Sequence, residues 1–248
     1  MTESSNVDFT EAAYRELLKT ARGRYAFRPF AAALTMADGI LWRHDIDMSP
    51  HRALALARIE RDEGVTASYF VHLHSNFYNV LETDVVAKLK EVAALGHEIG
   101  LHFDPQFRRL APGDHAGIVR AISLERDILH DAIGAPVVAV SFHDPDLAGF
   151  TDLGEDSIAG LVNAYGPRLR KEFTYCSDSN GYWRFKAIGD VLREPGHVRV
   201  QVLTHPEWWV PEPMSPRDRV ARAIHGRASG AAARYDAALR ALDRENRS

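Results

Sequence analysis

The sequence predicts an α/β fold, in the form of a single irregular (β/α) barrel of about seven strands. Short apolar segments alternate with helix-like stretches over most of the 248 residues, a pattern typical of parallel strands joined by helices. Polar residues recur where these apolar segments end, and barrel enzymes build their sites at the carboxyl ends of their strands. An open doubly wound sheet also places its site at strand ends and is the alternative.

Six strands stand out, at residues 40–47, 66–72, 98–104, 137–143, 173–178 and 198–205. Helices are expected between them, at residues 50–63, 84–95 and 115–133. Ser49 and Asp114 are suitable N-caps for the first and third of these helices. A glycine follows each helix, as is common where a helix stops.

The whole chain, residues 1–248, is expected to form one domain, because neither a repeat nor a linker-like tract divides it. A helix is expected at about 10–22, with Thr10 as its N-cap. A helical extension is expected at about 215–245, where Ser215 and Pro216 form a cap pair. It serves either as a solvated cover or as a contact between copies of the chain, so a homo-oligomer is one expectation.

Composition narrows the classes of function. The net charge of -4 argues against nucleic acid as the main partner, and no apolar run approaches the roughly 18 residues of a membrane span. The N-terminal segment lacks the basic-then-apolar order of a secretory signal, so a cytoplasmic location is expected. Cys176 is the only cysteine, which excludes an internal disulfide and a cysteine-based zinc site.

Histidine and aspartate gather at the ends of the expected strands. The clusters are RHDID at 43–47, HFD at 102–104, SFHD at 141–144, SDSN at 177–180 and LTH at 203–205. Strand alternation places Arg43, Asp45 and Asp47 on one face. Two acids on one face would repel each other and lose solvation without a cation. The convergence of carboxylates and imidazoles therefore predicts a divalent metal ion, with zinc the first expectation.

The same segments, in the same order, resemble the polysaccharide deacetylases, the nodulation-factor deacetylase-like enzymes of carbohydrate esterase family 4. RHDID at 43–47 is similar to the family's TFDDG, and TASYFV at 66–71 to its ATFF. GHEIGLH at 96–102 is similar to the family's GHEIGNH, and LTH at 203–205 to its closing LxxH. The GHEIG stretch is the most specific, and the resemblance spans about residues 40–205.

Two departures mark a divergent branch of that family. Gln106 stands where the family has its second ligand histidine, and SFHDP at 141–145 occupies the place of its RxPY segment. An amide oxygen is a poor zinc ligand beside imidazole. The third ligand, beside Asp47 and His102, is therefore expected to be His143, with Gln106 and Asp104 as the alternatives.

The resemblance implies a metal-dependent hydrolase that removes an acyl group, expected to be acetyl, from an amino sugar or glycoconjugate precursor. It implies Asp45 as the general base and His205 as the general acid, kept cationic by a carboxylate such as Asp178. Asp178 lies in a turn-rich segment, so a plain turn residue is the alternative for it.

Further residues are expected at the rim. The expected substrate contacts are Arg43, His74, Trp183 and Trp208, with aromatic or rim packing as the alternative for the last three. His72 alternates with His74 on one side of its strand, so packing or substrate contact is expected for it as well. His97 follows a glycine that ends a helix and is expected to hold the loop.

Two other functions stay open. One is a small-molecule amidase of the same fold, which substrate screening would separate from a sugar deacetylase. The other is a non-catalytic, sugar-binding relative, which the loss of histidine at position 106 suggests. Metal content separates this last function from the first two, because a protein that only binds sugar need not retain an ion.

Overall fold

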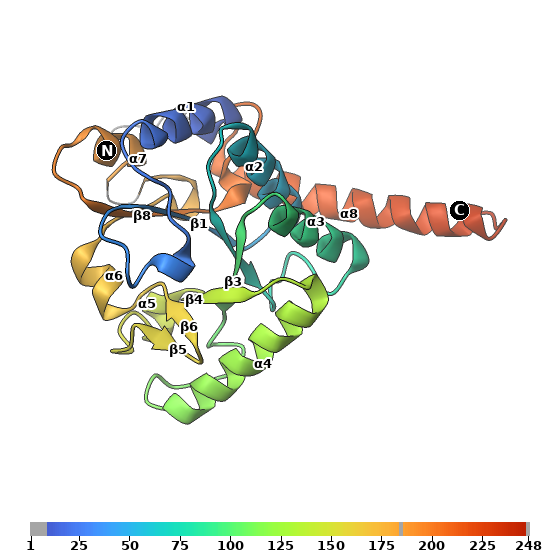
Figure 1. The fold of residues 1–248 in the computed structure, drawn as a ribbon. Coiled ribbons are helices and arrows are strands. Elements are labelled where there is room, and N and C mark those ends of the chain that lie inside the picture. The colour runs from blue at the N-terminus through green and yellow to red at the C-terminus, as the bar shows by residue number, and fades with distance from the viewer. Residues whose placement is uncertain (1–8, 184–185, 247–248) are drawn as a thin grey trace.

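A computed structural model describes residues 9–183 and 186–246 and contains one sheet with helices packed around it (Figure 1). The described residues form eight strands in the order β5-β6-β4-β3-β2-β1-β8-β7. All neighbouring strands are parallel except β5 and β6, which form an antiparallel pair. The α/β fold expected from the sequence is confirmed, with eight strands in place of about seven.

The strand order is that of a barrel opened at one seam. From β7 the order passes through β8 to β1 and then continues through β2, β3 and β4 to the β5–β6 pair. A doubly wound sheet would instead reverse its direction at a switch point near the middle. Within the described residues no ladder joins β5 to β7, so the irregular barrel is open between these two edge strands.

The strands expected from the sequence match six of those observed to within two residues. The strands are Gly39–Ile46 (β1), Ser68–His72 (β2), Glu98–Phe103 (β3), Val137–Phe142 (β4), Ser157–Ile158 (β5), Leu161–Asn163 (β6), Thr174–Ser177 (β7) and Arg199–Thr204 (β8). The β5–β6 hairpin was not expected, because strands of two and three residues are too short to show an alternating pattern.

Helices follow the strands as the βα pattern predicts. They are Glu11–Arg22 (α1), Pro50–Asp62 (α2), Thr83–Ala94 (α3), His115–Ile133 (α4), Pro145–Ala148 (α5), Pro167–Glu172 (α6), Ile188–Arg193 (α7) and Pro216–Ala241 (α8). Short 3-10 turns lie at Phe30–Ala32 (η2), Ser179–Gly181 (η3) and Pro206–Trp208 (η4). The predicted N-caps Thr10, Ser49, Asp114 and Ser215 each accept a hydrogen bond from the first helical turn.

The last helix, α8, extends away from the body of the molecule (Figure 1). Arg219, near its start, is the only buried residue of its 26 residues. Among the residues that the structure describes, no helix is both long enough and apolar enough to cross a membrane. The use of α8 as a contact between copies of the chain stays a prediction.

A fully buried carboxylate, Glu60 of α2, joins the helices to the first strands. Tyr14 of α1 donates to Glu60 Oε1, and Tyr69 of β2 donates to Oε2 at 2.7 Å. His44 Nε2 of β1 lies 2.6 Å from Oε1, and His44 Nδ1 lies 2.7 Å from the hydroxyl of Thr204 on β8. Burial opposes ionisation of Glu60, but the charge of His44 and its hydrogen bond lower the pKa of Glu60 below its usual value.

His97 has the structural role expected from the sequence. Its Nε2 lies 2.9 Å from the carbonyl oxygen of Ala57, and its Nδ1 accepts a hydrogen bond from the amide of Ala67 at 3.1 Å. Because Nδ1 accepts, Nε2 carries the proton and the ring is neutral. The ring therefore holds the start of β3 against α2 and the segment before β2.

We predict that Glu60→Ala lowers the free energy of unfolding by about 3–5 kcal/mol, because it leaves buried tyrosine and histidine groups without their shared partner. Chemical denaturation measures this loss. Glu91→Ala is the control, since Glu91 pairs with Arg58 on the surface at 2.6 Å and such pairs contribute about 1 kcal/mol or less. Equal effects of the two substitutions would contradict a supporting role for the buried network.

Candidate active site

A cavity of about 530 Å³ opens at the carboxyl ends of the parallel strands. Its wall includes residues that end or directly follow β1, β3, β4, β7 and β8, namely Asp47, His102, His143, Ser177 and His205. These are strand-end positions of the clusters singled out in the sequence. The βα pattern brings them together because successive parallel strands deliver their ends to the same rim.

Three donor atoms in this wall form a compact triangle. Asp47 Oδ1 lies 3.2 Å from His102 Nε2 and 3.6 Å from His143 Nδ1, and the two ring nitrogens lie 3.3 Å apart. Ligands of a tetrahedral zinc ion lie about 3.3 Å from one another, because Zn–N and Zn–O bonds are ~2.0–2.1 Å long. The spacing of the triangle therefore fits a divalent ion.

The electrostatics of Asp47 support the same reading. Its Oδ1 is buried and, despite the two rings nearby, accepts no hydrogen bond from the described residues. Burial disfavours the charged form, but the nearby rings of His102 and His143 hold the pKa of Asp47 well below its usual value. An ionised carboxylate with a lone pair left without a hydrogen is suited to bind a cation.

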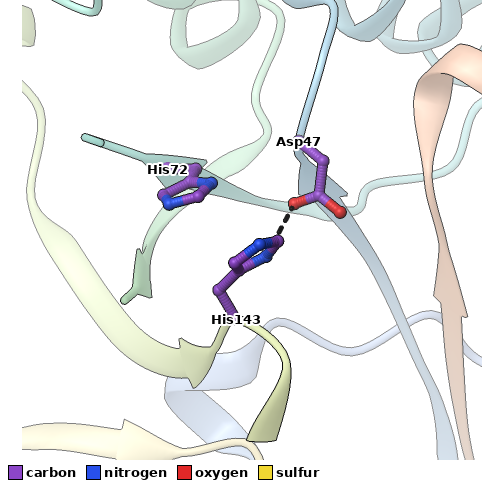
Figure 2. Close-up of side chains that lie close together, drawn as sticks. All are labelled: Asp47, His72 and His143. Carbon is purple, nitrogen blue, oxygen red and sulfur yellow. Dashed lines mark ion pairs between the residues drawn. The ribbon is translucent and has the colours of Figure 1, made fainter. Parts of the chain in front are cut away.

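His72 brings a fourth donor to the same place. One ligand atom each from Asp47, His72 and His143 lie within 4.8 Å of one another, and Figure 2 shows the three side chains facing a common point. His72 ends β2 in register with His102 on β3. Burial lowers the pKa of His72 below its usual value, which favours the neutral ring that a metal needs.

Sequence reasoning expected packing or substrate contact for His72 and did not select it as a ligand. Its signal was present, because His72 ends an expected strand and His102 lies near the end of the next one. What the sequence did not reveal is the register that aligns the two residues across neighbouring strands.

Gln106 and Asp104, the alternatives for the third ligand, have contacts of their own. Gln106 is exposed, and its backbone amide donates to Asp104 Oδ1 at 2.9 Å. Asp104 also accepts from the amide of Phe107, so it shapes the turn after β3. Of the three candidates, His143 is the one whose donor atom lies at the triangle.

His205 and Asp178 form a tight pair at the edge of the cavity. His205 Nδ1 lies 2.7 Å from Asp178 Oδ1, and Trp209 Nε1 donates to Asp178 Oδ2 at 2.9 Å. Burial by itself lowers the pKa of His205, but the hydrogen bond and charge of Asp178, with the charge of Asp47, raise it to about 10. His205 Nε2 then carries a proton 3.8 Å from Asp47 Oδ2. Asp178 is thus an orienting carboxylate as well as a turn residue.

Asp45, expected as the general base, does not line the cavity. It is 1% exposed, and its Oδ2 lies 3.0 Å from Arg43 Nη2 and 3.5 Å from His102 Nδ1. Ser141 Oγ lies between the same groups, 2.7 Å from His102 Nδ1 and 3.4 Å from Asp45 Oδ1. A general base must reach the water that it deprotonates. In this structure Asp45 lies behind the ring of His102, where a carboxylate orients a ligand.

The four residues expected to contact substrate also lie outside the cavity wall. Arg43 is fully buried and contacts Asp45 and the hydroxyl of Tyr165, the latter at 2.9 Å. Its charge therefore pairs with the carboxylate of Asp45.

His74 and the two tryptophans have packing partners instead. His74 Nε2 lies 3.0 Å from Glu125 Oε1, and its ring stacks on Phe107 with centroids 3.5 Å apart. Trp183 stacks on Phe9 with centroids 5.2 Å apart, and Trp208 is a buried core residue. These contacts are those of packed side chains, which was the alternative to substrate contact for all three residues.

The sequence did not predict a substrate contact at any residue of the outer wall, although Asp144 and Ser179 belong to the polar clusters at strand ends. The residues of this wall include Asp144, Asp146, Leu147, Thr151, Tyr165, Tyr175 and Ser179. Most of them follow β4 or β6 in loops and turns, where no periodic pattern marks which side chains point inward. Two tyrosines give this wall aromatic faces and hydroxyl groups, both of which suit a sugar ring.

Comparison with known proteins gives similarity to solved structures only, since no protein-family model and no curated protein matches the chain. A family 4 acetyl xylan esterase from Clostridium thermocellum, in complex with a cobalt ion, is 17% identical, with a TM-score of 0.41 over 76% of this chain and 84% of that one. The catalytic domain of a peptidoglycan N-acetylglucosamine deacetylase from Eubacterium rectale is 13% identical, with a TM-score of 0.47 over 80% of this chain and 90% of that one.

A family 4 pseudoenzyme from Bacillus anthracis is 12% identical, with a TM-score of 0.41 over 77% of this chain and 60% of that one. All three structures have TM-scores below 0.5 and are less than 20% identical to this chain. They are too distant to support an argument about chemistry, which depends on the side chains of this chain.

We predict that Asp47→Ala and His143→Ala each abolish stoichiometric binding of a divalent ion, whereas Gln106→Ala leaves it unchanged. The reason is that the first two remove donor atoms of the triangle and the third removes an exposed amide. Elemental analysis of the dialysed proteins, with titration calorimetry, measures the difference. Loss of the ion in the Gln106 variant, with retention in the His143 variant, would show that the third ligand has been misassigned.

A second substitution decides the role of Asp45. Removal of a carboxylate that orients a metal ligand lowers metal affinity by about 10–100-fold, so Asp45→Asn is expected to weaken metal binding by this amount. Competition with a chromogenic chelator gives the affinity. Asp144→Asn tests the same orienting role at His143, because Asp144 Oδ2 lies 3.6 Å from His143 Nε2. Full affinity with loss of turnover would return Asp45 to the role of general base.

Proposed function

We propose that this protein is a metal-dependent deacetylase that hydrolyses the acetamide of an amino sugar or of a glycoconjugate precursor. The observation that carries the proposal is that a group of metal-ligand donor atoms and a protonated histidine line the same cavity. The Asp47–His102–His143 triangle has the spacing of a metal centre, and the protonated Nε2 of His205 lies 3.8 Å from Asp47 Oδ2. Amide hydrolysis needs both, one at the carbonyl and one at the leaving nitrogen.

Asp47, His102 and His143 would hold the ion through Oδ1, Nε2 and Nδ1. A divalent ion bound there supplies Lewis acidity, which polarises the acyl carbonyl and lowers the pKa of a bound water toward about 7. The protein's part is to hold these donors rigidly. Asp45 with Ser141 fixes the ring of His102 from behind, and ligand orientation of this kind sustains affinity.

Proton transfer then falls to the two groups that face each other in the cavity. Asp47 Oδ2 accepts the proton that the attacking water gives up, and His205 Nε2 donates a proton to the departing amine. Asp178 keeps His205 in the cationic form and fixes its tautomer through Nδ1. The products are a free amine on the sugar and a carboxylate, so the atoms of one water molecule are divided between them.

The cavity supports a sugar as the substrate. Its volume of about 530 Å³ lies within the range of small-molecule sites, about 300–1,000 Å³. Tyr165 and Tyr175 offer ring faces and hydroxyls, and Asp146, Thr151 and Ser179 offer hydrogen-bond partners for sugar hydroxyls. The similar solved structures are named for activity on xylan, peptidoglycan and chitin. A cytoplasmic location stays part of this proposal and favours a nucleotide sugar, a glycolipid precursor or a small metabolite.

Release of acetate from N-acetylglucosamine oligomers and from N-acetylated nucleotide sugars, by protein loaded with one ion, tests the function. We predict that His205→Ala lowers kcat by about 10²–10⁴-fold with little change in KM, because a general acid acts mainly in the transition state. The wild-type kcat should persist at neutral pH and fall as the pH rises through the pKa of His205, where Nε2 loses its proton.

Two further measurements sharpen this test. Asp178→Asn should move the alkaline limb of the kcat profile to lower pH, because the charge that raises the pKa of His205 is gone. His225→Ala, on the exposed face of α8, is the control and should leave the profile in place. A metal-loaded protein that binds these sugars without releasing acetate would support the non-catalytic alternative, and turnover of simple amides alone would support the amidase.

A further inference from the structure

We propose that His72 and His102 bind the same ion, together with Asp47 and His143, so that the centre has four protein ligands and selects an ion with five or six coordination positions. This inference rests on the proposed function and deepens it, because it names the class of metal that the reaction uses. The four ligands would be three imidazoles and one carboxylate.

The position of His72 is the first step of the argument. Its ring lies against the ring of His143, with centroids 4.4 Å apart, and edge-on to the ring of His102, with centroids 5.5 Å apart. A ring nitrogen of His72 also lies within 4.8 Å of the donor atoms of Asp47 and His143. His72 thus lies beside Asp47 and His143 (Figure 2), and its strand β2 pairs with β3, the strand of His102.

The second step is the state of its two nitrogens. His72 is 4% exposed, and neither Nδ1 nor Nε2 has a hydrogen-bond partner among the described residues. The nearest carboxylate oxygen, Oδ2 of Asp104, lies 3.7 Å from Nε2, which is beyond hydrogen-bond distance. A buried polar group without a partner costs about 1–3 kcal/mol, and a metal ligated by the ring removes part of this cost.

Other buried histidines of the same chain show what a purely structural role looks like. Both nitrogens of His97 contact backbone groups, and both nitrogens of His44 contact buried side chains, with contacts of 2.6–3.1 Å. His72 is as deeply buried as these residues but lacks such contacts. His72 is therefore buried like a structural histidine, but its nitrogens lack hydrogen-bond partners, as expected of a metal ligand.

Coordination number gives the consequence. Catalytic zinc sites use three protein ligands and keep the fourth position for water, whereas four protein ligands close a tetrahedral site. A hydrolytic centre with four side-chain ligands therefore needs an ion that accepts more than four. Nitrogen-rich donors suit the later first-row divalent ions, such as Fe²⁺, Co²⁺ and Ni²⁺. With these, positions for the water and for the acyl oxygen remain open.

Cobalt as a spectroscopic probe tests the inference without substrate. The metal-free protein is titrated with Co²⁺ and its visible spectrum is recorded, since four-coordinate cobalt absorbs much more strongly than five- or six-coordinate cobalt. We expect weak bands for the wild type and intense four-coordinate bands for His72→Gln. We also expect the affinity of the variant to fall by at least about tenfold. His74→Gln, two residues along the chain and paired with Glu125, is the matched control and should equal the wild type.

Intense four-coordinate bands in the wild type, or identical spectra and affinities for the wild type and His72→Gln, would overturn the proposal. The wild-type spectrum decides the coordination number even where the glutamine variant does not fold, and His72→Asn provides a second substitution. The readouts are independent of turnover. If the cobalt spectra are as expected but no acetate is released, the four-ligand centre stands and the proposed function is wrong. If the protein is active but its cobalt is four-coordinate, the proposed function stands and the four-ligand centre is wrong.

Discussion

The geometry of the cavity depends on one half-buried negative charge, the carboxylate of Asp47. Three imidazoles approach it, those of His102 at 3.2 Å, His143 at 3.6 Å and His205 at 3.8 Å. Asp47 Oδ1 is buried, and burial of that oxygen disfavours the charged form unless such partners or a metal ion compensate. Each of the three rings has a second carboxylate on its far side, in order Asp45, Asp144 and Asp178. The rings are therefore held between two acids, which fixes their orientation toward the centre.

Strand β1 connects this centre to the rest of the molecule, because polar side chains leave it on both faces. Arg43 and Asp45 pair on the barrel side, where Asp45 reaches His102, whereas His44, between them, points to the helices and reaches Glu60. Burial of charge on both faces of one strand is tolerated because each face has its own set of partners. A shift of β1 by one residue would exchange the two sets and leave every one of these groups without its partner, so the two networks together define the register on which Asp47 depends.

Much of this could be predicted from the sequence, because it follows from local rules. Alternation and glycine stops located β1, β2, β3, β4, β7 and β8, and the caps located the major helices. The rule that parallel strands end at one rim was sufficient to group Asp47, His102, His143 and His205. The features that the sequence could not predict depend on how deeply each side chain is buried and on the register between neighbouring strands. Asp45 shares a strand face with Asp47, yet one carboxylate is behind a histidine and the other is in the cavity wall. The tyrosines of the outer wall and the β5–β6 hairpin lie in segments without a periodic pattern, and Arg43 gained a partner within its own strand instead of a substrate.

The absence of histidine at position 106 carries less weight in this architecture than in a site built from one contiguous motif. Ligands at the rim of a barrel come from several strand ends, so a donor missing after β3 can be supplied by β2 or β4 at nearly the same point in space. His143 and His72 occupy those positions here. The buried atoms without hydrogen-bond partners include Asp47 Oδ1 and both nitrogens of His72, and one nitrogen of His72 lies within 4.8 Å of a carboxylate oxygen of Asp47. Groups that only packed together, or only bound sugar, would gain nothing from such unmet bonding capacity, since each such atom destabilises the folded chain. The placement of these atoms is therefore an argument for a retained metal centre, and against a chain that has kept only the shape of the site.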